Sequence, residues 1–398
     1  MKQNRAACCI LACFLWICCL AGCGKEEPDF ILGMDASSVP SLEAGGVQYY
    51  NKDGMAQDVF AILADGGIRY IRVRVWNDPY DEAGNGYGGG NCDIQNALAI
   101  GKRATRYGMK LLVDFHYSDF WADPGKQQAP KAWQGMTARQ KADALYSFTC
   151  DSLKLLKDAG VQVGMVQIGN ETNSAIAGET SWEAMAMLFS AGAKAVRDTL
   201  PDALVAVHFS NPEKAGAYEY FAGQLEQYGV DYDVFASSYY PQWHGSLENL
   251  QQVLKTVKET YGKQVLVVET AHAYTAQDLD FHSNTVNADT ATPYPKTPEG
   301  QAAWVQDVVD AVREIGGLGV CYWEGTWIGA GGSTYEENKV LWETYGSGWA
   351  SSYAGAYDPQ DAGKYYGGCA VENQAFFDRD GKVLSSFGVF AQIEKEQK

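Results

Sequence analysis

The feature that most constrains the fold of this 398-residue chain is a regular alternation of short β-rich runs with amphipathic helical patterns. Runs of branched and aromatic residues predict eight strands, at residues 31–36, 68–76, 110–116, 163–169, 204–209, 234–240, 264–270 and 319–323. Apolar residues at helical spacing predict helices at 55–64, 94–107, 137–159, 182–200, 215–228, 247–261 and 299–315, and a last helix after Ser386. Glycines such as Gly160 and Gly262 follow most of these helices, as expected where a helix ends in left-handed backbone.

This alternation predicts a (β/α)8 barrel, the TIM barrel, because that fold is built from repeated strand–helix units of this kind. A doubly wound open sheet is the alternative, but no glycine-rich phosphate motif follows the first strand. No Pro/Ser-rich or low-complexity segment divides residues 30–398, so we expect one domain. The loops after the seventh and eighth strands are long for a barrel, and the second of them covers residues 329–368.

Residues 1–22 have the pattern of a secretion signal. Lys2 and Arg5 precede an apolar run that ends in Leu-Ala-Gly before Cys23, and the run is short for a membrane span. The ending resembles a bacterial lipobox, in which Cys23 becomes the lipidated first residue of the mature protein, followed by a short linker to residue 29. A conventional signal peptide cut elsewhere is the alternative. We expect a secreted, cell-surface lipoprotein that is anchored to a membrane only through Cys23.

Composition narrows the possible partners. The chain has 31 Lys and Arg against 49 Asp and Glu, and this net charge of −18 argues against nucleic-acid binding. Aromatic residues make up 13% of the chain. Most should pack in the core, and several could line a groove, where a flat ring covers the C–H face of a sugar. Beyond Cys23, no CxxC pair suggests a zinc site among the remaining cysteines, which are Cys92, Cys150, Cys321 and Cys369.

Polar side chains recur where the predicted strands end. Active sites of (β/α)8 barrels lie at the C-terminal ends of the strands, so such residues should gather at one face. Each residue alone could serve a structural ion pair or fill space, but seven strand ends agree. The residues are Arg72 and Arg74, Asp114 and His116, Asn170 and Glu171, His208, Tyr239 and Tyr240, Glu269, and Trp323 and Glu324.

Two carboxylates lie on opposite sides of the predicted ring. Glu171 follows the fourth strand, and Glu269 belongs to the seventh, where Val265 and Val267 share its parity and therefore its expected face. Facing carboxylates suit glycoside hydrolysis, in which one group with a raised pKa donates a proton and the other attacks as an ionised nucleophile. The alternative for Glu269 is a structural ion pair with an arginine of the barrel.

Longer stretches around these residues carry a specific resemblance. They are GIRYIRVRVWNDPY, LLVDFHYSDFWADPGKQQAPKAW, VQIGNETN, VAVHFSNPE, SSYYPQWHG, VVETAHAY and GVCYWEGTWI. From about Phe30 to its C-terminus the chain resembles family 53 of the glycoside hydrolases, the endo-β-1,4-galactanases, within the clan of retaining (β/α)8 glycosidases. The resemblance implies an enzyme that cuts internal β-1,4-galactosidic bonds in the (arabino)galactan side chains of pectin by a double displacement.

The resemblance also implies roles for individual residues. Glu171 matches the acid/base and Glu269 the nucleophile, while Asn170 would bind the 2-hydroxyl of the sugar. Arg72 would keep Glu269 ionised, although Arg74 shares its parity and is the alternative. Further substrate contacts are expected from Tyr240, which would orient the nucleophile, and from Asp114, His116, Trp121, His208, Trp323 and Trp327.

A second constellation follows the seventh strand. In AQDLDFHSNTVN the residues Asp278, Asp280, His282 and Asn284 occur at every second position. Oxygen ligands suit Ca²⁺, although histidine is an odd ligand for it, and spacing alone fits a solvated polar loop equally well. Bacterial members of family 53 resemble this pattern where they hold a structural Ca²⁺. The resemblance therefore favours calcium, with remaining ligands near residues 368–372.

Alternative functions remain open on the sequence. A mannanase or cellulase of the same clan would share the two carboxylates. A lipid-anchored glycan-binding protein without catalysis would keep the barrel but not need both. We expect a monomer that acts on a galactan polysaccharide.

Overall fold

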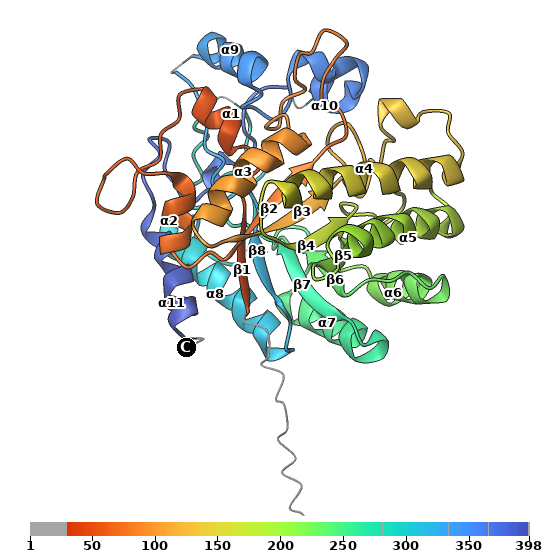
Figure 1. The fold of residues 1–398 in the computed structure, drawn as a ribbon. Helices are drawn as coiled ribbons and strands as arrows, with labels where there is room; N and C mark the ends of the chain where they lie inside the picture. The colour runs from red at the N-terminus through yellow and green to blue at the C-terminus, as the bar shows by residue number, and fades with distance from the viewer. Residues whose placement is uncertain (1–29, 281, 333, 365, 397–398) are drawn as a thin grey trace, which may run out of the picture.

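The computed structural model describes residues 30–280, 282–332, 334–364 and 366–396. The signal peptide, Cys23 and the linker predicted for residues 1–29 lie outside them. Eight parallel strands pair in chain order, and β1 also pairs with β8, so the sheet closes into a barrel (Figure 1). The predicted (β/α)8 barrel is confirmed. The strands are β1 (Ile31–Asp35), β2 (Tyr70–Val75), β3 (Lys110–Phe115), β4 (Val163–Ile168), β5 (Leu204–Phe209), β6 (Val234–Ser238), β7 (Gln264–Glu269) and β8 (Gly319–Tyr322).

Helices surround the barrel and end within a few residues of their predicted bounds. One differs at its start, because Asp58 accepts the N–H of Phe60 and so begins α2 four residues later than apolar spacing suggested. The surrounding helices are α2 (Val59–Asp65), α3 (Ile94–Arg106), α4 (Ala138–Asp158), α5 (Trp182–Thr199), α6 (Ala217–Gln227), α7 (Leu247–Tyr261), α8 (Pro298–Glu314) and α11 (Gly388–Glu396).

The long loop after β8 contains helices that the sequence analysis treated as loop. They are α9 (Tyr335–Tyr345) and α10 (Pro359–Lys364), with short 3-10 turns between and after them. In Figure 1 these helices lie with α1 (Val39–Ala44) at the upper end of the molecule. Within the described ranges, no helix has both the length and the apolar character needed to cross a membrane.

The inside of the barrel changes from apolar to polar along the strands. Side chains of one parity form a closed apolar cluster in the lower part of the barrel. Because successive residues of a strand point to opposite faces, the residue two positions later points inward one layer higher. On four strands that later residue is polar and buried: Asp114 above Leu112, Gln167 above Met165, His208 above Ala206, and Ser238 above Ala236.

Strand β7 departs from this alternation, and one prediction is therefore wrong. Val265 and Val267 pack in the outer cluster with residues of α7 and α8, whereas Leu266 and Val268 face the inside. Ser237 of β6 pairs with Val267, but its neighbour Ser238 pairs with Glu269, so one extra residue interrupts the register. This bulge turns Glu269 away from the face of Val265 and Val267 and toward the mouth of the barrel.

Barrel closure depends on the close approach of β8 to β1. A Cβ atom added to Gly319 would lie 2.4 Å from the carbonyl oxygen of Ile31, its partner on β1. We predict that Gly319→Ala lowers the free energy of unfolding by about 1–3 kcal/mol, because a backbone atom cannot move aside as a flexible side chain can. Denaturant unfolding measures this difference.

Gly355→Ala is the matched control, since nothing lies within 4 Å of the added Cβ there. It should stay within about 0.5 kcal/mol of the native chain. Equal stability of the two variants would contradict the assigned role of Gly319.

Candidate active site

Glu171 and Glu269 converge at the C-terminal end of the barrel. Glu171 follows β4 in left-handed backbone, with φ 46°, and its N–H donates to Nδ1 of His208 over 3.3 Å. Glu269 ends β7 and is 6% exposed. The hydroxyl of Ser238 on β6 lies between the two carboxylates, 2.7 Å from Oε1 of Glu171 and 3.4 Å from Oε2 of Glu269. The structure thus brings together the two residues that the sequence placed on separate strands.

The environments of the two carboxyl groups differ in charge. Burial, and then the charge of Glu269, raise the pKa of Glu171 to about 8. Burial also raises the pKa of Glu269, but the guanidinium of Arg72 lies 2.8 Å from its Oε1 and opposes the rise. Tyr240 donates to its Oε2 over 2.9 Å. The surroundings therefore favour the proton on Glu171, and Arg72 and Tyr240 favour the ionised form of Glu269.

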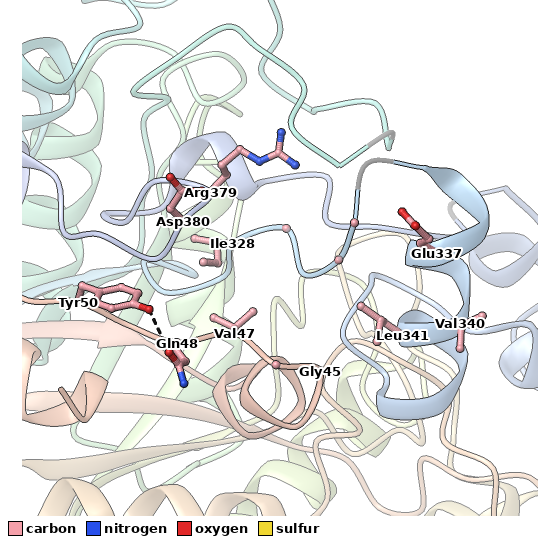
Figure 2. A pocket seen from close by; sticks show the side chains of 14 residues that line it. Gly45, Val47, Gln48, Tyr50, Ile328, Glu337, Val340, Leu341, Arg379 and Asp380 are labelled. Carbon is pink, nitrogen blue, oxygen red and sulfur yellow. Dashed lines mark hydrogen bonds between the residues drawn. The ribbon is translucent and has the colours of Figure 1, made fainter. Parts of the chain in front are cut away.

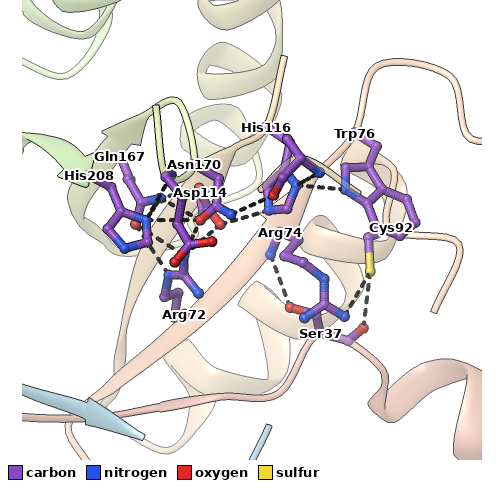
Figure 3. A network of polar contacts seen from close by, with 12 residues as sticks. Ser37, Arg72, Arg74, Trp76, Cys92, Asp114, His116, Gln167, Asn170 and His208 are labelled. Carbon is purple, nitrogen blue, oxygen red and sulfur yellow. Dashed lines mark hydrogen bonds and ion pairs between the residues drawn. The ribbon is translucent and has the colours of Figure 1, made fainter. Parts of the chain in front are cut away.

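Arg72 is the centre of a buried polar network, drawn in Figure 3. Besides Glu269, it contacts Asp35 and Asp114 at 2.8 Å each, and its NH2 group donates to Oδ1 of Asn170 over 2.9 Å. Nδ2 of Asn170 donates to the carbonyl of Ala122 over 2.8 Å, so both ends of this amide are held. Arg72 therefore fixes both the charge of Glu269 and the position of Asn170.

Arg74 has different partners, which settles the choice between the two arginines. Its guanidinium pairs with Glu324, lies 3.5 Å from Asp35 and stacks 4.4 Å from the ring of Trp121. It makes no contact with Glu269 among the ion pairs of the described residues. Burial raises the pKa of Glu324 to about 8, although Arg74 opposes the rise. Arg72, not Arg74, is thus the arginine that faces the catalytic candidate.

A cleft of about 490 Å³ opens above these groups. Of the residues predicted as contacts, those that line it are Arg74, His116, Trp121, Asn170, Glu171, Tyr240, Glu269 and Trp323. Arg72, Asp114 and His208 are completely buried one layer below, where they hold Glu269 and Asn170 instead of reaching the cleft.

The aromatic wall of the cleft differs from the prediction. Trp327 was expected to stack on a sugar, but it is fully buried, so this expectation is wrong. It lies parallel to Trp349 at 6.0 Å between ring centroids, and Trp349 in turn stacks on Trp121 at 4.4 Å. Trp349 and the half-exposed Trp243 line the cleft, although the sequence analysis did not name them. Trp327 supports the wall from behind.

A larger cavity of about 670 Å³ lies elsewhere, between the loops after β1 and β8 and the turn at Arg379 and Asp380 (Figure 2). Glycines make up much of its lining, and Tyr50 there donates to Gln48 over 3.0 Å. None of the strand-end residues predicted from the sequence lines this cavity. Size alone therefore does not identify the site of chemistry.

The predicted metal ligands are partly gathered. Carboxylate oxygens of Asp278, Asp280 and Glu372 lie within 4.8 Å of one another. Two buried oxygens beside them, Oε2 of Glu372 and Oδ1 of Asn284, have no hydrogen-bond partner among the residues that the structure describes. The imidazole of His282 is not part of this cluster of the described residues, but its backbone N–H donates to Asp280 over 3.0 Å. Oxygen donors of this kind fit a hard cation such as Ca²⁺.

Comparison with known proteins agrees with this geometry. A family model described as glycosyl hydrolase family 53 matches residues 31–390. Over 370 residues, 92% of this chain and 86% of the relative, the chain is 57% identical to a Bacillus subtilis (strain 168) protein named endo-beta-1,4-galactanase. It is 35% identical over 333 residues to an arabinogalactan endo-beta-1,4-galactanase of Cellvibrio japonicus, covering 80% of this chain and 86% of that protein.

Solved structures show the same similarity. The catalytic domain of an Ignisphaera aggregans GH53 protein superposes with a TM-score of 0.81 at 37% identity, covering 91% of this chain and 95% of that one. A fungal beta-1,4-galactanase gives a TM-score of 0.72 at 28% identity, covering 91% and 99%.

The raised pKa of Glu171 has a consequence for stability. Below the unfolded pKa, near 4.5, both states hold the proton; as pH rises toward 8, only the folded state still does, so the folded state loses stability. Glu171→Gln removes this loss. We predict that its melting temperature exceeds that of the native chain by roughly 1–3 °C at pH 8.5, with a smaller difference at pH 5.

Glu183→Gln serves as the control, because that carboxylate is exposed at the start of α5. It should show no such growth of the difference with pH. A pH-independent difference for Glu171→Gln would contradict the raised pKa.

Proposed function

The chain belongs to glycosyl hydrolase family 53, and we propose that it hydrolyses internal β-1,4-galactosidic bonds of (arabino)galactan with retention of the anomeric configuration. The names of its relatives in Bacillus subtilis and Cellvibrio japonicus support the substrate. The open cleft with its aromatic wall supports binding of a chain of sugars rather than a single residue.

The contact of both carboxylates with one hydroxyl is the observation that carries the proposal. Oxygens that lie 2.7 Å and 3.4 Å from Oγ of Ser238 are no more than about 6 Å apart. Retaining enzymes separate their carboxyl groups by about 5–5.5 Å, and inverting enzymes by about 6.5–9.5 Å to admit a water. The short separation favours direct attack of Glu269 on the anomeric carbon.

The first step divides the work between the two groups. Glu171, which holds the proton, donates it to the glycosidic oxygen while Glu269 attacks the anomeric carbon and the bond to the leaving sugar breaks. Arg72 and Tyr240 keep Glu269 ionised and oriented for this attack. In the second step Glu171, now ionised, takes a proton from the water that releases the sugar from Glu269.

Asn170 is the neighbour best placed to touch the substrate. It lines the cleft, and its amide is fixed by Arg72 below and by Ala122 at the side. A group fixed in this way loses little freedom when a sugar hydroxyl binds, so the contact can strengthen as the transition state forms.

We predict that the native chain releases reducing ends from linear β-1,4-galactan, and that Glu171→Gln and Glu269→Gln each lower this rate at least about 100-fold. Glu183→Gln should keep full activity. Proton NMR of the first product should show the β-anomer, as retention requires.

Mannan and cellulose separate the alternatives in the same assay. Cleavage of either of them in preference to galactan would assign the protein to another activity of the clan. Binding of galactan without any reducing ends would identify a glycan-binding protein and contradict the proposal.

We also propose that Asp278, Asp280, Glu372 and the Oδ1 atom of Asn284 hold a structural Ca²⁺. These groups come from the loop after β7 and from the end of the loop after β8, so one cation would tie the two loops together. Bound calcium would supply charge compensation to three clustered carboxylates. The partnerless buried oxygens of Glu372 and Asn284 support this proposal.

We predict that a chelator lowers the melting temperature of the native chain by roughly 5 °C or more and that added Ca²⁺ restores it, because a ligand of the folded state alone stabilises that state. Asp280→Asn should remove the response. Asp289→Asn, on an exposed part of the same loop, should keep it. A melting temperature unaffected by chelation would contradict the metal site.

Secretion with lipid attachment at Cys23 is a further part of the proposal. It rests on the sequence of residues 1–23, which precede the described residues. The described domain starts at Phe30 and enters β1 at its first residue, Ile31, at the end of the barrel opposite the catalytic pair. A short tether from Cys23 would therefore leave the cleft facing away from the membrane.

A further inference from the structure

Among the contacts of the described residues, Ser238 is the one side chain that hydrogen-bonds to both Glu171 and Glu269. Its side chain is completely buried on β6, and its hydroxyl lies 2.7 Å from Glu171, 3.4 Å from Glu269 and 2.9 Å from Nε2 of His208. A hydroxyl has one hydrogen to donate and two lone pairs that accept. The hydroxyl has one hydrogen and three partners, so the direction of each hydrogen bond depends on which partners are protonated.

The state of His208 decides one of these directions. Burial, and then the charge of Arg72, lower the pKa of His208 well below its usual value, so the ring is neutral and has one N–H. Its Nδ1 faces two donors, the backbone N–H of Glu171 at 3.3 Å and Nε2 of Gln167 at 3.1 Å. Oδ1 of Asn170, at 2.9 Å, favours the other tautomer but already accepts from Arg72. We assign the hydrogen to Nε2, which then donates to Ser238.

We propose that the Ser238 hydroxyl is a two-position switch, which donates its hydrogen to Glu269 while Glu171 is protonated and to Glu171 once Glu171 is ionised. When Glu171 holds its proton, Glu171 donates to Ser238 and the hydrogen of Ser238 turns to Glu269. When Glu171 is ionised, the hydrogen of Ser238 turns back to Oε1 of Glu171. His208 donates to Ser238 in both states, so the hydroxyl oxygen always keeps a donor and the hydrogen alone moves.

The switch follows the two steps of the proposed reaction, on which this inference rests. Before the first step Glu269 is the ionised nucleophile and receives the hydrogen. After the attack Glu269 is a neutral ester and Glu171 is the ionised base, so the hydrogen moves to Glu171. No bond to carbon forms or breaks at Ser238, and no proton leaves it. Ser238 is therefore a positioning residue, which gives each carboxylate a hydrogen-bond donor at the step in which that carboxylate is the reacting anion.

Other groups around the pair do not change in this way. Asp123 lies on the loop after β3, and its charge raises the pKa of Glu171, while Ser210 is a second hydrogen-bonding neighbour that lowers it. Arg72 and Tyr240 contact Glu269 and not Glu171 in the contacts of the described residues. Ser238 is thus the one hydroxyl shared by both carboxylates among those contacts.

The test is the pH dependence of kcat/KM on galactan for Ser238→Ala. Its alkaline limb, which reports loss of the proton from Glu171, should move up by about one pH unit, because the anion loses its close donor. Its acid limb, which reports ionisation of Glu269, should also move up. This shift should be smaller than that of the alkaline limb, because the contact of Ser238 with Glu269 is longer than its contact with Glu171. We expect kcat to fall about tenfold.

Ser237→Ala is the matched control. Ser237 is the neighbour on the same strand and is equally buried, but it faces the outside of the barrel and bonds to Tyr218. Neither limb should move in this variant. If only the alkaline limb moves in Ser238→Ala, Ser238 is a fixed donor to Glu171. If neither limb moves, Ser238 only fills space. Either result overturns the switch.

A measurement without substrate separates this inference from the proposed function. In protein labelled with ¹³C at the glutamate carboxyl, the signals of Glu171 and Glu269 are assigned by their loss in Glu171→Gln and Glu269→Gln. Ser238→Ala should raise the titration midpoints of both signals. If the native chain fails to cleave galactan while both midpoints rise, the proposed function fails and the switch stands. If galactan is cleaved and both midpoints stay in place, the proposed function stands and the switch fails.

Discussion

A shortage of buried positive charge is the constraint on which the site depends. Five carboxyl groups gather at the mouth of the barrel, on Asp35, Asp114, Glu171, Glu269 and Glu324, and two guanidinium groups, on Arg72 and Arg74, lie among them. The nearby imidazoles of His116 and His208 add no charge, because burial lowers the pKa of both. Four of the five carboxyl groups are buried and Glu171 is partly buried, so water compensates their charges poorly and the protonated form is favoured where no cation is close.

The arrangement of the arginines decides which of these carboxyl groups favour the protonated form. Arg72 pairs with Asp35, Asp114 and Glu269, and in the described part of the chain no ion pair links it to Glu171. Glu171 therefore faces the charge of Glu269 without a cation of its own, and its pKa rises. Arg72 therefore affects both members of the pair: it favours the ionised form of Glu269 by contact, and because it pairs with Glu269 and not with Glu171 among the described contacts, the pKa of Glu171 stays high.

Arg74 connects the buried polar layer of the barrel to the aromatic wall of the cleft. Arg74 joins Glu324 beyond β8 to the face of Trp121, and Trp349 stacks on that ring from the long loop after β8. A cation against an aromatic face is attractive and holds the ring in one orientation. The loop is thus fastened to the barrel through an aromatic stack, and the wall of the cleft takes its position from the same polar layer that sets the charges.

Much of this could be predicted from the sequence, for a physical reason. Strand and helix periodicity are local properties, so eight strands and their order were predictable, and polar residues at strand ends identified Asn170, Glu171 and Glu269. The ion-pair partner of a side chain is not a local property. Arg72 and Arg74 share a parity, and only the folded structure shows that they pair with different carboxylates. Trp349 lies in a loop without periodicity. Ser238, two residues after inward-facing Ala236, could have been found by parity alone, but serine gives little signal.

The bulge in β7 determines whether Glu269 points into or out of the barrel. Strand parity alone would place Glu269 among the helices, and Val268, the extra residue of the bulge, reverses its direction. The direction of Glu269, the proposed nucleophile, is therefore determined by a count of residues rather than by their kind. If β7 continued past Val267 in regular register, without the bulge, every chemical group of the site would still be present in the sequence, but Glu269 would point out of the barrel.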